Sequence, residues 1–153
     1  MLRRITLLIT ATTALVCRNV DARLWETKSQ LDVRYGKPAM SSRDADGLTY
    51  VYKFNQFQVV VTLLDGKSQN EIYYHTNSSR LTPAEIEALL SFNALGNRWR
   101  VSEGVFSLFK PSGGHPIAVG LYSPDAPSPA LAVRTADFIR MADSLLRTKK
   151  MRP

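Results

Sequence analysis

The sequence predicts an α+β fold in which antiparallel β-meanders pack against two to three short helices. Three observations lead to this prediction. Two segments carry helix-start signals, several segments alternate apolar and polar residues with the period of a β-strand, and the dipeptide Asp65-Gly66 separates two of those strands. A chain of 153 residues, of which 44% are hydrophobic, is long enough to bury one core.

Residues 1–22 have the pattern of a secretory signal peptide. Arg3 and Arg4 precede the apolar run Ile5–Val16, which is too short to span a bilayer. Small residues occupy the −3 and −1 positions of a cleavage site after Ala22. We therefore expect an exported protein, periplasmic or extracellular, with no transmembrane segment after cleavage.

Cys17 lies within this segment and raises the question of a lipid anchor. A lipoprotein signal needs a small residue directly before the modified cysteine, and here that residue is the branched Val16, so we expect no lipid at Cys17. Cleavage would leave a single α+β domain, residues 23–153, without cysteine. Such a domain has no disulfides, thiolate nucleophiles or zinc–thiolate sites.

The first helix is expected at about Lys28–Tyr35. Thr27 and Gln30 have the spacing of a capping box, in which each side chain binds the other residue's backbone N–H. Gly36 can adopt a positive φ at the end of the helix, and Pro38 cannot continue it.

A loop and then three strands are expected after this helix. Residues 39–47 are polar and rich in turn formers, which is typical of a loop. The strands are expected at Leu48–Phe54, Phe57–Leu64 and Lys67–Thr76, with Asp65-Gly66 as the turn of the second hairpin.

The second half opens with a helix signal of the same kind. Thr82 is the expected N-cap, Pro83 occupies the first helical position, and Glu85 completes the capping box. The remaining expected segments are strands at Arg98–Ser102, Val105–Lys110, Ile117–Tyr122 and Ala130–Thr135, and a last helix at about Ala136–Arg147. The repeated order favours two related αβββ units, residues 25–79 and 80–148, as an alternative to one undivided domain.

The sequence contains no recognisable catalytic, metal or cofactor motif. The two histidines, His75 and His115, lie in no zinc-binding pattern, and no G-x-S-x-G nucleophile motif occurs. We therefore predict a non-enzymatic protein without cofactor or metal. Carboxylate pairs of the glycosidase type come from distant positions, so an envelope hydrolase acting on cell-wall material stays as the alternative.

An aromatic row on the expected meander supplies the candidate binding residues. These are Tyr50, Tyr52 and Phe54 on one strand and Tyr73 on another. An exposed row would form a platform for another macromolecule, whereas a row under the helices would belong to the core. In the second case the opposite face would be open, with Lys53, Gln58, Val60 and Thr62.

The run Tyr35-Gly36-Lys37-Pro38 and the turn Asp65-Gly66-Lys67, placed behind a signal sequence, resemble the small envelope proteins of the SmpA/OmlA (BamE-like) type. The wider layout is similar to the β-lactamase-inhibitor-protein fold, with its tandem helix-plus-sheet units. The likeness covers about residues 25–76. It implies a non-enzymatic binding module and no catalytic residues, although the lipid-modified cysteine of that family has no good counterpart in Cys17.

The leading functional prediction is an exported binding or scaffold protein that acts through a sheet face. Removal of residues 1–22 would lower the net charge from +7 to +5, a moderate positive charge that suits an envelope protein or an anionic envelope surface as partner. No nucleic-acid-binding motif is present, and nucleic acid is not an expected partner. A structural or stress-response protein with no dedicated ligand is the further alternative.

Overall fold

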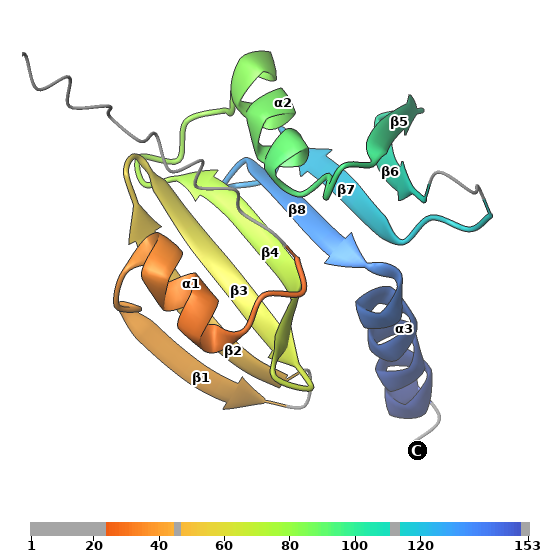
Figure 1. Cartoon of the computed structure of the whole chain (residues 1–153), viewed down its shortest axis with the longest axis horizontal. Helices are drawn as coiled ribbons and strands as arrows, with labels where there is room; N and C mark the ends of the chain where they lie inside the picture. The colour runs from red at the N-terminus through yellow and green to blue at the C-terminus, as the bar shows by residue number, and fades with distance from the viewer. Residues whose placement is uncertain (1–23, 45–46, 111–113, 151–153) are drawn as a thin grey trace, which may run out of the picture.

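The computed structural model describes residues 24–44, 47–110 and 114–150, and over these ranges three helices accompany one eight-stranded sheet (Figure 1). Every neighbouring pair of strands is antiparallel, in the order β1-β2-β3-β4-β8-β7-β6-β5. The elements are α1 (Lys28–Tyr35), β1 (Met40–Asp44), β2 (Gly47–Phe54), β3 (Phe57–Leu64), β4 (Lys67–His75), α2 (Pro83–Phe92), β5 (Arg98–Ser102), β6 (Val105–Phe109), β7 (Ala118–Ser123), β8 (Ala130–Thr135) and α3 (Ala136–Lys150). The α+β class is confirmed, with one continuous sheet that is larger than the predicted meanders.

Two four-stranded meanders meet edge to edge where β4 pairs with β8. The first meander follows α1 and the second follows α2. Their seam runs from the pair Asn70–Arg134 to the pair Tyr74–Ala130. Each half therefore has four strands behind its helix. Four are predicted for the second half, whereas only three are predicted for the first.

The additional strand of the first half is β1, which occupies most of the predicted loop 39–47. All five of its residues are exposed, so the segment lacks the alternating burial that reveals a strand in a sequence. Its backbone nevertheless pairs with β2, from Met40–Val51 to Asp44–Gly47. At Gly47, with φ of +126°, a Cβ atom would lie only 2.4 Å from the Leu63 carbonyl oxygen, so this close approach requires glycine.

Both capping boxes form as predicted. The Thr27 side chain accepts a hydrogen bond from the Gln30 N–H, and Thr82 does the same with Glu85. α1 begins and ends at the predicted residues, while α3 continues to Lys150. α3 follows β8 and lies beside the β3–β4 hairpin end of the first half (Figure 1).

The core lies between the sheet and the two helices α1 and α2. Leu31 and Tyr35 of α1 and Leu89 and Leu90 of α2 are buried against the same sheet face. The strand residues of that face that are buried with them are Tyr52, Val59, Val61, Leu63, Tyr73, Leu108, Ala118, Leu131 and Val133.

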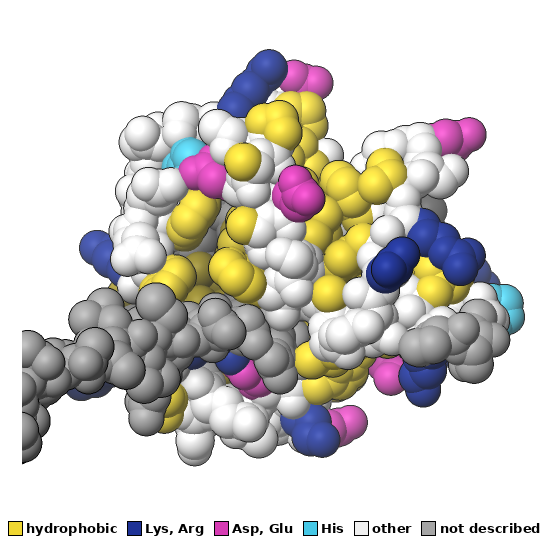
Figure 2. All heavy atoms as spheres, turned by 45° about the horizontal axis from the view of Figure 1, so that its top comes forward, with side chains coloured by type: hydrophobic (Ala, Val, Ile, Leu, Met, Phe, Trp, Pro, Cys, Tyr) yellow, Lys and Arg dark blue, Asp and Glu magenta, His cyan; other side chains and the backbone are white. Residues whose placement is uncertain are grey.

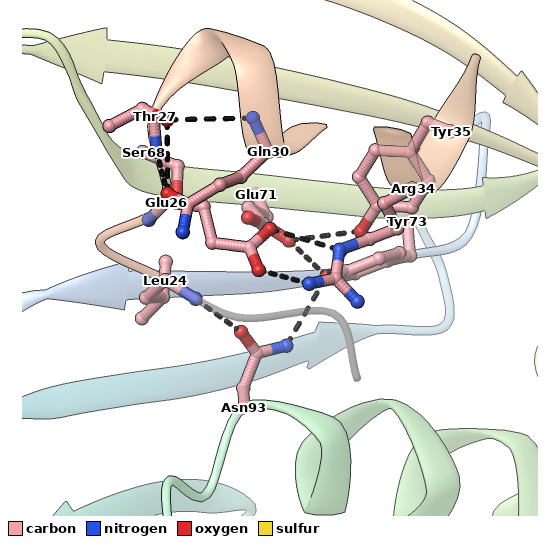
Figure 3. A network of polar contacts seen from close by, with 10 residues as sticks. All are labelled: Leu24, Glu26, Thr27, Gln30, Arg34, Tyr35, Ser68, Glu71, Tyr73 and Asn93. Atoms are coloured by element: carbon pink, nitrogen blue, oxygen red, sulfur yellow. Dashed lines mark hydrogen bonds and ion pairs between the residues drawn. The ribbon is translucent and has the colours of Figure 1, made fainter. Parts of the chain in front are cut away.

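A buried polar network connects the N-terminal segment with α2 and β4 (Figure 3). The Leu24 N–H donates to Asn93 Oδ1 over 2.9 Å, and Asn93 Nδ2 donates to Tyr73 Oη over 3.2 Å and to the Leu89 carbonyl over 3.0 Å. Asn93 is fully buried, so these bonds satisfy an amide that has no access to water.

Glu71 lies at the centre of the network and is fully buried. Its Oε2 accepts hydrogen bonds from the Tyr73 and Tyr35 hydroxyls, while its Oε1 has no hydrogen-bond partner among the described residues. Arg34 forms a two-pronged ion pair with Glu26 nearby. Burial raises the pKa of Glu71 above its ordinary value of 4.5, the Tyr73 hydrogen bond opposes that shift, and the charge of Glu26 adds to it.

We predict that Glu71→Gln stabilises the protein increasingly as the pH rises above about 4.5, the ordinary pKa of a glutamate. A raised native pKa means that the folded state holds a proton after the unfolded state has lost it, so wild-type stability falls as pH rises through that window. The amide of the Glu71→Gln variant does not ionise, so this loss of stability with rising pH is absent. Urea unfolding of both proteins between pH 4 and pH 9 measures the difference, with Glu103→Gln at the exposed β5–β6 turn as the control for net charge. A difference that does not change with pH would contradict the assignment.

Candidate functional site

An apolar groove of about 770 Å³ lies between α2 and the strands of the second meander. Figure 2 shows hydrophobic side chains lining the hollow. Its floor is made by Trp99, Val101, Phe106 and Tyr122, and its wall by Leu81, which precedes α2, and by Ile86 and Leu90 of α2. A concave, mostly apolar site of this size is typical of ligand-binding pockets.

The floor follows from the alternation of side chains on β5 and β6. Trp99 pairs with Leu108 and Val101 pairs with Phe106, so all four side chains point to the face that carries the helices. The wall follows from helical spacing, because Ile86 and Leu90 are four residues apart on α2.

Two hydrogen-bonded aromatic rings fix α2 over the sheet. Trp99 Nε1 donates to the Leu90 carbonyl over 2.6 Å, at the end of the helix. The Tyr122 hydroxyl accepts from the Leu81 N–H over 3.1 Å, just before the helix begins. Both polar atoms are thereby satisfied by backbone, which leaves the ring faces to line the groove.

Gly120 sets how closely α2 approaches the sheet. A Cβ atom at this position would lie 2.9 Å from a methyl carbon of Leu90 and 3.2 Å from Phe106 Cβ. Glycine therefore lets the helix settle onto β7, while β5 and β6 extend past the helix and form the groove.

The predicted platform residues are not an open surface. Tyr52 and Tyr73 are 0% and 1% exposed, and Tyr50 and Phe54 are half-buried against the same core. The Tyr35 ring of α1 lies 5.3 Å from the Tyr52 ring and 5.4 Å from the Phe54 ring. The structure brings the row together beneath α1 as core, because the helix needs an apolar surface to cover.

The opposite face of the sheet carries the other predicted set. Lys53, Gln58, Val60 and Thr62 all point away from α1 and α2, as the register of β2 and β3 requires. A cross-strand row on this face is made by Met40, Val51, Val60, Ile72, Ala132, Leu121 and Val105. Beside this apolar row, hydrogen bonds join Thr49, Thr62, Asn70 and Arg134.

Basic side chains flank the groove at β5. Arg98 and Arg100 alternate with Trp99 and Val101, so they lie on the other face of the strand, and Lys110 follows β6. Figure 2 shows Lys and Arg side chains gathered on this side of the hollow. A smaller pocket of about 460 Å³ is lined by all three cations.

These three cations are available to a ligand. None of them forms an ion pair with a residue of the described ranges, and the Arg100 guanidinium stacks 4.7 Å from the centre of the Phe109 ring. Together with the groove, they create an apolar floor bordered by positive charge.

A serine, a histidine and a glutamate also meet at the end of β4. His75 Nε2 lies 3.0 Å from Glu85 Oε1, and His75 Nδ1 shares a hydrogen bond with Ser79 Oγ. Because an ionised carboxylate can only accept, Nε2 carries a proton, and in the neutral ring Nδ1 accepts from Ser79. The Thr82 N–H lowers the pKa of Glu85, which keeps that carboxylate ionised.

This arrangement has a structural use as well. Glu85 completes the capping box of α2 and also accepts a hydrogen bond from Gln56 Nε2 over 2.7 Å. Ser79 is exposed, and neither the groove nor the pocket at β5 is lined by any of the three residues. His115, the second histidine of the chain, lies exposed in the loop before β7.

The described part of the chain shows no group of three His, Cys, Asp or Glu side chains placed to hold a metal. None of the described helices combines the length and the apolar character needed to cross a bilayer. The predicted signal segment 1–22 and Cys17 lie outside the described residues.

Sequence reasoning did not identify Trp99, Val101, Phe106 or Tyr122 as candidate binding residues. Their alternation is visible in the strand segments, but the same alternation occurs in the first half, where the face is covered. The one available signal was the arginine–apolar pattern of Arg98–Val101, which places charge and apolar surface on opposite faces of a single strand.

No protein-family model and no curated protein matches the chain. Among solved structures, a cysteine-rich secretory protein from Staphylococcus aureus subsp. aureus Mu50 is similar over 75% of this chain, with a TM-score of 0.44 and 13% sequence identity. The chain spans 46% of the length of that protein.

Proposed function

We propose that the protein is a non-enzymatic binding module that receives apolar side chains of a partner protein in the groove between α2 and β5–β7. The observation that carries the proposal is that a helix covers the sheet face fully in the first half and leaves part of it open in the second. In the first half, Leu31 and Tyr35 of α1 seal the sheet face, and in the second half no described side chain fills the space beside α2.

An exposed apolar residue at the groove supports a binding role. Val101 is 65% exposed on the groove floor. An apolar hollow left open to water costs stability. Large exposed apolar patches are uncommon on monomeric proteins, and where they occur they mark binding sites for a partner or ligand.

We predict that Val101→Glu weakens binding of a neutral apolar probe, N-phenyl-1-naphthylamine, by roughly tenfold or more, because the carboxylate would have to be desolvated beside the bound ring. Probe fluorescence during titration measures the affinity. Val33→Glu, on the exposed side of α1 at 83% exposure, makes the same chemical change away from the groove. Equal affinities of the two variants, or no binding to the wild type, would overturn the groove as the site.

Export through residues 1–22 is part of the same proposal. Cleavage after Ala22 would retain Leu24, which is buried and hydrogen-bonded to Asn93, so the mature chain would keep every described contact. The partner is then an envelope protein, in line with the resemblance to the SmpA/OmlA type, which stays a prediction.

N-terminal sequencing of the protein recovered from the periplasm or medium of a bacterial host tests export. We expect the mature chain to begin at Arg23. Replacement of the apolar Leu7 and Leu8 by arginine should retain the full-length precursor in the cytoplasm. Cytoplasmic accumulation of the wild type with Met1 intact would contradict the proposal.

We also infer that the halves 25–79 and 80–148 are two related units. Each opens with a threonine capping box and continues into a four-stranded antiparallel meander. The two meanders join through their last strands, β4 and β8, which makes the order of strands symmetric about the seam.

Hydrolysis is the second candidate, and the Ser79–His75–Glu85 arrangement favours it. In such a reaction Ser79 Oγ would attack an acyl carbon of cell-wall material while its proton passes to His75 Nδ1, and Glu85 would stabilise the resulting imidazolium. The imidazolium would return the proton to the leaving group as the acyl bond breaks, and water would then hydrolyse the acyl-serine. The exposed position of Ser79 outside both pockets makes it the weaker candidate.

Covalent labelling with a fluorophosphonate probe decides on this second function. If Ser79 is a nucleophile, Ser79→Ala should abolish labelling and His75→Ala should slow it by about a hundredfold or more. Ser78→Ala removes the neighbouring hydroxyl and should leave labelling intact. A wild type that reacts no faster than Ser79→Ala would exclude the serine mechanism.

A further inference from the structure

The strand that borders the groove is also a free edge of the sheet. β5 is the last strand in the sheet order, and four of its five residues are exposed. Its hairpin with β6 has the two-residue turn Glu103-Gly104, with φ of 51° and 79°, which closes on the pair Ser102–Val105.

This register determines which backbone groups face outward. In an antiparallel ladder, pairs with and without mutual hydrogen bonds alternate, and a two-residue turn is closed by a hydrogen-bonded pair. Ser102, Arg100 and Arg98 therefore bond to β6. The N–H and C=O groups of Trp99 and Val101 point away from β6, toward the open edge.

The side chains of the same strand separate into two chemical faces. Trp99 and Val101 point to the face of the groove, whereas Arg98 and Arg100 point to the other face and line the smaller basic pocket. Arg98 and Trp99 lie between the two hollows and border both. A strand added beside β5 would continue this division, because opposite residues of paired strands point to the same face.

We propose that the partner segment is an extended peptide with alternating apolar and acidic residues, which adds antiparallel to β5 as a further strand. This inference rests on the proposed function of the groove and names its ligand. The apolar residues enter the groove beside Trp99 and Val101 and exchange backbone hydrogen bonds with them. The acidic residues lie opposite Arg98 and Arg100 on the other face.

Charge complementarity and the second edge of the sheet support this choice of occupant. Arg98, Arg100 and Lys110 form no ion pair with described residues, so acidic side chains would neutralise them. The other edge strand, β1, carries the polar sequence MSSRD and borders neither pocket. Of the two edge strands in the described sheet, β5 is the one that combines outward-facing backbone groups, an apolar groove and basic charge.

The length of β5 sets the size of the ligand. Five residues at about 3.4 Å each span roughly 17 Å, so five to seven peptide residues suffice. Main-chain hydrogen bonds supply affinity in this mode of recognition, and the alternating side chains supply specificity.

The test uses a fluorescein-labelled peptide of three glutamates alternating with two valines, measured by fluorescence anisotropy on the full mature chain. Arg100→Glu should weaken binding by about tenfold or more, because an attractive contact becomes repulsive. Arg43→Glu, on the exposed edge strand β1, makes the same charge change and should leave binding unchanged. Rising salt should weaken binding of the wild type.

Backbone pairing is tested without changing the protein. Methylation of the two valine nitrogens removes the N–H groups that face β5 and should reduce binding by about tenfold or more. Methylation of the glutamate nitrogens, which face away from β5, should have little effect. This comparison also holds if Arg100→Glu fails to fold, which circular dichroism would reveal.

Titration of N-phenyl-1-naphthylamine on the same samples separates the two proposals. If the probe binds the groove but the peptide does not bind up to about 1 mM, or binds equally well when its valines are methylated, strand addition is overturned and the groove function stands. If neither binds, both proposals fail. Peptide binding that is sensitive to Arg100→Glu and to valine methylation establishes the ligand class.

Discussion

The pairing of β4 with β8 is the constraint on which the rest of the molecule depends. It joins two local meanders through residues more than fifty positions apart, such as Tyr73 with Leu131. Every other ladder connects neighbours in the sequence. Because the seam lies at the centre of the sheet, the residues of β4 become core, and Glu71 is buried with them. The hydroxyls of Tyr73 and Tyr35 and the nearby Arg34 offset part of the cost of enclosing that carboxyl.

The same seam explains why only one half keeps an open groove. Leu24, Asn93 and Tyr73 tie the N-terminal segment and the end of α2 to the centre of the sheet. α2 is therefore held near β7 and β8, where Gly120 admits it, and the outer strands of its half stay uncovered. α1 is held to the same network through Tyr35, its last residue, and lies across Tyr52 and Phe54, so its half is sealed.

Local features could be predicted from the sequence, whereas long-range arrangement could not. Capping boxes and the Asp65-Gly66 turn act over four residues and appear in the structure where they were expected. β1 was missed because its strand character comes only from pairing with β2, and its exposed residues carry no pattern. The period of two places Tyr50, Tyr52 and Phe54 together on one face, but whether a helix covers that face depends on tertiary contacts. For that reason the groove beside Trp99 could not be distinguished from the sealed face beneath α1.

The arginines of β5 affect strand pairing at this edge in two ways at once. Charged side chains on an edge strand oppose indiscriminate pairing with other strands, since two copies of β5 would bring like charges together. The same charges favour a strand that carries carboxylates at alternate positions. β5 can thus stay open as an edge without promoting self-association, provided that its partner is acidic on one face and apolar on the other. The specificity of this edge thus has two sources: repulsion between arginines disfavours pairing of two β5 strands, and attraction to carboxylates favours an acidic strand.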